Sequence, residues 1–165
     1  AIADFTRVID LDPNDAEAYR RRANAFADSK NLQAALTDHA TAIGLDPDLP
    51  KVFSDRAWLK AQLSDYQGTI SDATEAIARN PKSAVAWRLR GIARFYLRDF
   101  PGCILDCSTA LTLDPSDPFA YEGRASAKLD SGDRAGAIED FRHALTLKPD
   151  LKQSKEGLAE ALQEP

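Results

Sequence analysis

The residue types best suited to chemistry recur in this sequence as one arginine and one aspartate. The two residues lie 16 positions apart, and the chain contains four such pairs. A charged catalytic site would not normally be copied four times, whereas a planar guanidinium and a carboxylate suit bidentate pairing. We therefore predict structural contacts between two helices, either within one repeat or between neighbours. The pairs are Arg22 with Asp38, Arg56 with Asp72, Arg90 with Asp106, and Arg124 with Asp140.

The cysteines and histidines could bind a metal, but they are few and scattered. Cys103 and Cys107 lie four residues apart, which on one helix places their Cβ atoms about 5–6 Å apart, too far for a relaxed disulfide. We expect two small, buried, apolar side chains. His39 and His143 belong to different parts of the chain, whereas a metal site needs several convergent donors. We expect a packed His39 and an exposed His143.

Sequence motifs for nucleophilic catalysis and phosphate binding are missing. The chain contains no Gly-x-Ser-x-Gly segment, no cysteine beside a histidine and no phosphate-binding glycine loop. Most carboxylates are explained as parts of solvated helix faces. We predict that these residues include no catalytic, cofactor-binding or metal-binding site, and that the chain is not an enzyme.

The charge balance and hydropathy exclude two classes of partner. The formal net charge is -5, and proteins that neutralise nucleic-acid phosphates usually carry a basic face. No apolar run reaches the roughly 18 residues of a membrane span, so we expect neither nucleic acid nor membrane as a partner. The absence of a cysteine framework favours a reducing, cytoplasmic location. Because residues 1–5 resemble the interior of a repeat, we expect that the chain is cut from a longer one, which leaves room for a targeting signal outside it.

A proline at a fixed interval defines the elements that must position these residues. Five of the nine prolines follow one another at intervals of 34 residues, and such self-similarity indicates one supersecondary unit repeated in series. Alanine-rich blocks and only eight glycines favour helix over sheet. We therefore predict an all-α protein of stacked repeats. The prolines are Pro13, Pro47, Pro81, Pro115 and Pro149.

Counting from these prolines gives four whole repeats, each with two helices. An asparagine or aspartate near the middle of each repeat is a good helix N-cap, and the proline ends the second helix. A final capping helix would pack through Leu158, Ala159 and Leu162. We predict a truncated repeat at 1–15, whole repeats at 16–49, 50–83, 84–117 and 118–151, and the capping helix within 152–165.

A bulky ring followed one helical turn later by a small residue accompanies the proline period. Tyr19 precedes Ala23, for example, at positions that are equivalent in every repeat. In this pattern the whole chain resembles the tetratricopeptide repeat family. The resemblance implies a right-handed α-α superhelix, a solenoid of stacked helical hairpins. The chain departs from the family pattern where Lys60, Arg94 and Lys128 stand at a position usually held by a large aromatic residue.

In the resembled family, the first helix of each repeat lines an inner groove. Carrying the groove positions over residue by residue gives a surface with both charged and apolar side chains, and such exposed apolar area commonly marks a partner site. The same groove positions also hold Glu17, Asp28 and Ser126. The implied groove residues are Arg20, Arg21, Asn24, Lys51, Asp55, Trp58, Arg88, Leu89, Ile92, Phe95, Tyr96, Phe119 and Glu122.

Two features of this implied groove lead to expectations about its ligand. We expect Arg20, Arg21, Lys51 and Arg88 to form a basic cluster suited to a carboxylate. The exposed rings include Trp58 and Phe95, and the alternative is that these two turn inward to fill the gaps left by Ala73 and Cys107.

The groove positions also test one activity known from the resembled family. Its chaperone-binding members grip a C-terminal carboxylate with lysine, asparagine and arginine at five positions. Here those positions hold Arg20, Asn24, Asp55, Val85 and Leu89. Only the first two fit, so the sequence does not support a clamp for chaperone tails.

We predict that the chain is a non-catalytic scaffold for protein interactions that holds a peptide or partner segment in its concave groove. One alternative is a regulatory or substrate-presenting domain of a larger enzyme. Another is a module that self-assembles weakly through its terminal repeats.

Overall fold

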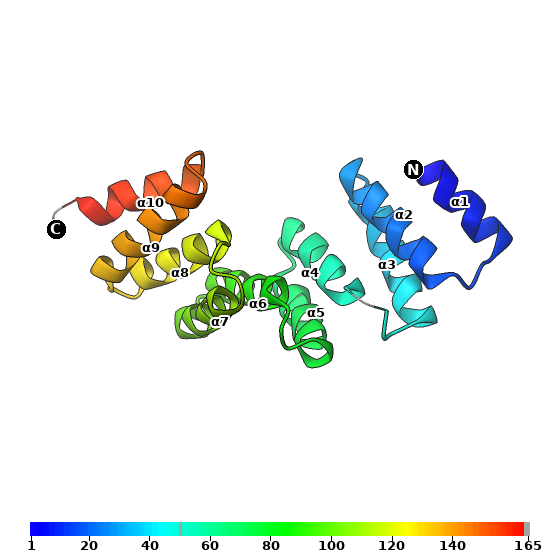
Figure 1. The fold of residues 1–165 in the computed structure, drawn as a ribbon, viewed down its shortest axis with the longest axis horizontal. Coiled ribbons are helices and arrows are strands. Elements are labelled where there is room, and N and C mark those ends of the chain that lie inside the picture. Colours follow the sequence, from blue (N-terminus) through cyan, green and yellow to red (C-terminus); the bar gives the residue numbers. More distant parts are fainter. Residues whose placement is uncertain (50, 164–165) are drawn as a thin grey trace. The chain divides into compact units, whose positions relative to one another are not determined.

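The computed structural model describes residues 1–49 and 51–163, and these residues form ten α-helices and no strand (Figure 1). All ten of these helices are 10 to 14 residues long, and short turns join them. The predicted all-α class of helical hairpins is confirmed. The helices are α1 (Ile2–Leu11), α2 (Ala16–Asp28), α3 (Leu32–Leu45), α4 (Val52–Gln62), α5 (Tyr66–Arg79), α6 (Ala84–Tyr96), α7 (Phe100–Leu113), α8 (Pro118–Asp130), α9 (Arg134–Leu147) and α10 (Lys152–Leu162).

The chain divides into two compact units, residues 1–79 and residues 80–165. In the first unit α2 packs on α3 and α4 on α5, while α1 packs on α2. In the second unit α6 packs on α7 and α8 on α9, and α10 covers α9 and α8. Each predicted 34-residue repeat thus contains one helical hairpin, while the repeat boundaries themselves stay a prediction.

Side-chain caps start the helices where the sequence predicted them. The Asp99 carboxylate accepts a hydrogen bond from the Gly102 amide at 2.9 Å, which satisfies one of the free donors in the first helical turn. Asp65 caps α5 in the same way, through the Gly68 amide. The remaining side-chain caps are Asp15, Asn31, Ser83, Asp117 and Asp133.

The predicted arginine–aspartate pairs are confirmed, and each pair lies within one repeat. In the third repeat, the Arg90 guanidinium donates two hydrogen bonds of 2.8 Å to the Asp106 carboxylate, which is fully buried. The other pairs repeat this bidentate geometry at 2.7–2.9 Å. Because one partner lies on the first helix and the other on the second, each pair ties its hairpin together.

A second cation reaches the same aspartate in three of the repeats. Lys60 contacts Asp72 at 2.9 Å, and Arg94 contacts Asp106 at the same distance. Lys128 contacts Asp140 equivalently. The departures from the family pattern noted above are therefore basic residues that neutralise the buried carboxylates.

Removing one partner of such a pair should be far more damaging than replacing both. We expect Asp38→Ala to lower the free energy of unfolding by about 3 kcal/mol, because it leaves the largely buried Arg22 guanidinium without its carboxylate. The double variant Arg22→Met/Asp38→Leu leaves no unpaired charge and should lose clearly less. Urea unfolding followed by circular dichroism measures both. Equal losses in the two variants would contradict this account.

The two cysteines and the two histidines lie as expected. Cys103 and Cys107 are buried free thiols with their Sγ atoms 3.9 Å apart. The contact with the Cys103 thiol, together with burial, raises the pKa of Cys107. His143 is exposed, with its ring stacked on Tyr121 at 5.2 Å. His39 is 1% exposed, and its Nδ1 atom has no hydrogen-bond partner among the described residues.

The buried His39 should make stability depend on pH. Burial lowers its pKa from 6.5 to about 4, so between these values the unfolded chain binds a proton that the folded chain excludes. Stability should therefore fall as the pH drops from about 6.5 towards 4, by up to about 3 kcal/mol from this group. Replacing His39 with Phe, the residue at the equivalent Phe141, should remove this part of the slope. The exposed His143→Gln should not, and identical slopes for both variants would overturn the assignment.

The capping helix α10 packs through Leu158 as predicted, but the rest of its buried face differs from the predicted one. Ser154 and Ala161 are buried and Leu158 packs against the core, whereas Leu162 is 54% exposed. Ala159, which we expected to be inward, is exposed. The reason is the close approach of α9, since a Cβ atom at Gly157 would lie 2.3 Å from the Phe141 ring. The helix therefore turns its glycine towards α9.

Candidate partner-binding grooves

The first helices of the hairpins carry the residues predicted to bind a partner. In the first unit, one pocket gathers side chains from α2 and α4. It brings together the predicted Asn24, Asp55 and Trp58 with the neighbouring Asp28. Trp58 is 42% exposed, so its indole stays at the surface and does not fill the gap at Ala73. The inward alternative is wrong for this ring.

The predicted basic cluster is wrong in the first unit, because carboxylates of the chain neutralise its arginines. Arg20 contacts both Glu17 and Asp55 at 2.7 Å, and Arg21 contacts Glu17 at 2.6 Å. The hydrogen bond from Arg20 is the largest cause that lowers the pKa of Glu17 to about 2. Lys51 is exposed but lies at the N-terminal end of α4, outside the pocket.

A second pocket, in the second unit, is lined mainly by aromatic and apolar side chains. The helices α6 and α8 form its walls, and α10 adds Gln153. The cavity volume is about 80 Å³, whereas small-molecule sites usually exceed roughly 300 Å³. This pocket unites the predicted residues Arg88, Ile92, Phe95, Tyr96, Phe119 and Glu122, together with Gly123 and Ser126.

Arg88 also forms an ion pair within the chain. Its guanidinium lies 2.6 Å from Asp117, the aspartate whose side chain caps α8, and it also lies over the Phe119 ring at 5.6 Å. Lys148 approaches the same ring at 4.8 Å. Arg88 therefore contacts the N-terminal end of α8 and the Phe119 ring. Its charge is paired with Asp117, so it is not a free cation for an incoming carboxylate.

Two further residues differ from the predicted surface. Leu89 is 4% exposed, so it belongs to the core and its prediction as a groove residue is wrong. The reason is that the buried face of the first helix is wide enough to include this position. Phe95 is half-buried and packs against the cluster of Cys103, Cys107 and Ala127. The inward alternative is thus correct for Phe95, although this residue still lines the pocket.

Two residues at or near the second pocket were not among the predicted groove residues. Gln153 enters it from α10, and Lys148 comes from the turn after α9. Both lie outside the first helices to which the family pattern assigns the groove. A hydrogen bond of 2.6 Å from Ser154 to Glu122 shows why α10 contributes. The helix is held beside α8, and no motif in the sequence signals this contact.

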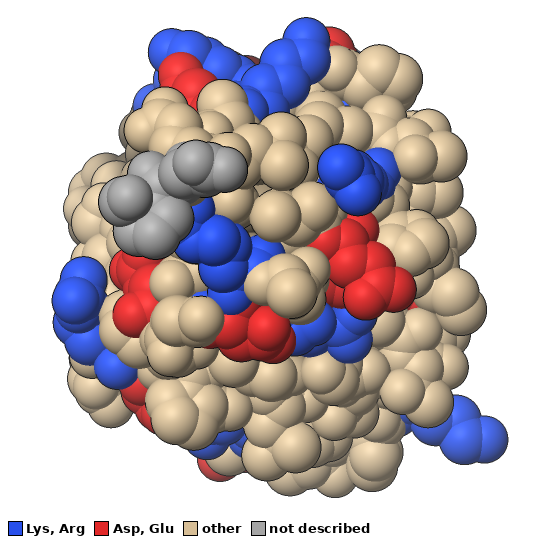
Figure 2. All heavy atoms as spheres, turned by 90° about the vertical axis from the view of Figure 1, so that its left-hand side faces the viewer, with Lys and Arg blue, Asp and Glu red and all other residues tan. Residues whose placement is uncertain are grey.

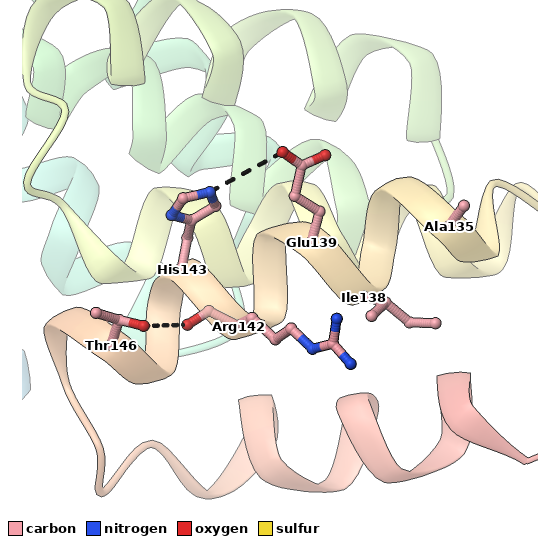
Figure 3. A pocket seen from close by; sticks show the side chains of 6 residues that line it. All are labelled: Ala135, Ile138, Glu139, Arg142, His143 and Thr146. Carbon is pink, nitrogen blue, oxygen red and sulfur yellow. Dashed lines mark hydrogen bonds and ion pairs between the residues drawn. The ribbon is translucent and has the colours of Figure 1, made fainter.

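A third pocket lies on one face of α9 alone, away from the predicted groove residues (Figure 3). His143 and Glu139 lie 4.0 Å apart on adjacent turns, and the Thr146 hydroxyl donates to the Arg142 carbonyl at 2.9 Å. Ala135 and Ile138 complete the lining. These are ordinary contacts along a helix surface, and they bring no nucleophile and base together.

The charged side chains on the side where α8, α9 and α10 lie do not form a patch of one sign. Figure 2 shows basic and acidic residues next to each other among uncharged ones on this face. Within residues 1–49 and 51–163, no group of three His, Cys, Asp or Glu side chains could hold a metal ion. No helix of this part of the chain is long and apolar enough to cross a membrane.

Comparison with known protein families agrees with this architecture. Two models described as tetratricopeptide repeat match residues 1–50 and residues 120–151. No curated protein matches the chain.

Several solved structures share the fold along most of the chain. One of them is a crystal structure of MamA, which is 20% identical, with 90% of this chain and 86% of that chain covered and a TM-score of 0.80. YrrB, described as a tetratricopeptide repeat protein with an unusual peptide-binding site, is 17% identical, with 98% and 83% covered and a TM-score of 0.80.

A third solved structure is the second tetratricopeptide repeat domain of human RPAP3 in complex with an HSP70 peptide. It is 26% identical, with 68% of this chain and 93% of that chain covered and a TM-score of 0.63. The matching family models at both ends of the chain, the ten helices in hairpins and the shared fold lead to one conclusion. The chain is a tetratricopeptide repeat protein.

Proposed function

We propose that this protein is a non-catalytic interaction module that binds a peptide, or a segment of a partner protein, on the surfaces of its first helices. The observation that carries the proposal is the gathering of exposed rings in the second pocket. Tyr96 is 48% exposed and Phe119 39% exposed, and both line that pocket with Ile92. Large rings held at the surface are common anchors of protein interfaces.

The shape of the second pocket supports a side chain of a larger partner as its ligand. A volume of about 80 Å³ accommodates part of a peptide but not most of a drug-sized molecule. Arg88 and Lys148 hold the Phe119 ring from two directions. Such a fixed ring loses little conformational entropy when a partner packs against it, which favours binding.

Similarity to RPAP3 supports peptide binding as the mode of interaction, since that domain is in complex with an HSP70 peptide. The likeness does not extend to a clamp for a terminal carboxylate. Arg20 is one of the two residues here that match such a clamp, and it is already bound to Asp55 and Glu17. The proposed partner is therefore a protein or peptide, without a requirement for a free C-terminus.

Truncating the Phe119 ring should weaken binding without unfolding the protein. Peptides of 12 residues would first be selected from a random displayed library on the intact chain. Their affinity should fall about 30-fold in Phe119→Ala, the usual loss for an aromatic anchor. Isothermal titration calorimetry measures the affinity, and circular dichroism checks that helix content is kept.

Leu105→Ala is the matched control for this experiment. Leu105 is another large exposed apolar residue, 64% exposed, but it lies on α7, the second helix of its hairpin. Its truncation should leave the affinity unchanged. Loss of binding in Leu105→Ala and not in Phe119→Ala would reject the first helices as the binding surface, and failure to select any peptide would reject the proposed function.

A further inference from the structure

The pocket of the first unit differs in chemistry from that of the second. Its lining combines two carboxylates, those of Asp28 and Asp55, with an amide from Asn24 and the indole of Trp58. The positive charges expected beside it are bound to carboxylates of the chain itself. The Trp58 indole therefore lies next to Asp28, which has no cation among the described residues, and next to Asp55, which pairs with Arg20 through one oxygen atom.

The acidic groups of this pocket keep unused acceptor atoms. The Asp28 carboxylate forms no hydrogen bond or ion pair with any residue in the described ranges 1–49 and 51–163, and it is exposed. Asp55 accepts hydrogen bonds from Arg20 and Asn24 at its Oδ2 atom. Its Oδ1 atom accepts none from the described residues, and the side chain is 25% exposed. Two carboxylates thus present free oxygens to the pocket.

The Trp58 ring is also unoccupied, in contrast with other rings of the chain. Arginines lie over the rings of Tyr19, Phe53 and Trp87 at 5.4, 5.9 and 4.7 Å. Over Trp58 no arginine or lysine of the described residues is found within such a distance. The indole is the ring that attracts cations most strongly, and 42% of this residue is exposed.

We propose that this pocket binds a basic side chain, lysine or arginine, from the partner segment. The cation forms ion pairs with Asp28 and with the Oδ1 atom of Asp55, while its aliphatic stem and charge lie over the Trp58 indole. This inference rests on the proposed function, because it describes which residue of a bound peptide enters the first unit.

Charge and ligand number favour a basic side chain over the other occupants of such a pocket. An acidic side chain would meet Asp28 and Asp55 without a free cation, since Arg20 and Arg21 are paired. A metal ion would need more oxygen donors than two carboxylates. The formal net charge of -5 further favours encounter with a basic partner.

Three peptide pools test the proposal on the intact chain. Each pool has nine residues, with lysine, norleucine or glutamate fixed at the centre and uncharged residues other than tryptophan at the eight flanking positions. Norleucine keeps the apolar stem of lysine without its charge. The variant Trp87→Phe leaves Trp58 as the only tryptophan of the two in the sequence, so its fluorescence reports binding in this pocket.

The lysine pool should bind at least about fivefold more tightly than the norleucine pool, as expected for an ion pair near the surface. The glutamate pool should bind most weakly. The advantage of lysine should shrink when the salt concentration rises from about 0.05 M to about 0.5 M, because exposed charges are then screened.

Two variants locate the binding, and a third is the control. Asp28→Asn and Trp58→Leu should each weaken binding of the lysine pool about fivefold, with NMR amide shifts as the readout for Trp58→Leu. Asp130→Asn makes the same charge change at the equivalent position of the fourth repeat, on α8, and should have no effect.

The outcomes separate this inference from the proposed function. Equal binding of the glutamate and lysine pools, or loss of lysine preference in Asp130→Asn and not in Asp28→Asn, overturns the basic-residue site and leaves peptide binding intact. If no pool binds while selected peptides still depend on Phe119, the basic-residue site alone is rejected. If no pool binds and no peptide can be selected, both proposals fail.

Discussion

The fold of this protein depends on one buried contact that is made in every repeat, between an arginine of the first helix and an aspartate of the second. A carboxylate that is fully buried, such as that of Asp106, is tolerated only when its charge is met by a well-oriented partner. The bidentate geometry therefore restricts how each helix is rotated about its own axis and how far it is shifted along its partner. Once they are fixed, the remaining faces of the first helix, including those that carry Trp58 and Phe119, have defined directions.

The same principle governs which charges remain available to a partner. Arg20, Arg21 and Arg88 occupy groove positions, yet each is paired with an acidic residue of its own unit. The first unit consequently presents carboxylates and an indole, and the second unit presents rings and aliphatic side chains. The two surfaces differ in ligand chemistry although their backbone positions are equivalent. The repeated backbone determines where a side chain points, and local pairing determines what it can bind.

Much of the fold was predictable from the sequence because it depends on features that recur at one spacing. The proline period, the capping residues and the pair of Arg90 with Asp106 all repeat, so chance matches are excluded. The site was predictable only in part. The contact of Arg88 with Asp117 joins α6 to the N-cap of α8 and depends on side-chain rotamers, which the period does not specify. Leu89 and Ala159 show a second reason, since the width of a buried stripe depends on how closely the next helix approaches.

Because both members of each bidentate pair belong to the same 34-residue segment, every whole repeat carries both charges of its own pair. A gene duplication or deletion that spans a whole repeat would add or remove an arginine together with its aspartate, for example Arg56 together with Asp72. None of these buried aspartates would be left without its arginine at the new junction. A change in the length of the array would therefore affect only the contacts between neighbouring hairpins, which include packing and ion pairs such as that of Arg20 with Asp55. Its surface residues can then diversify without disturbing the electrostatic balance of the interior.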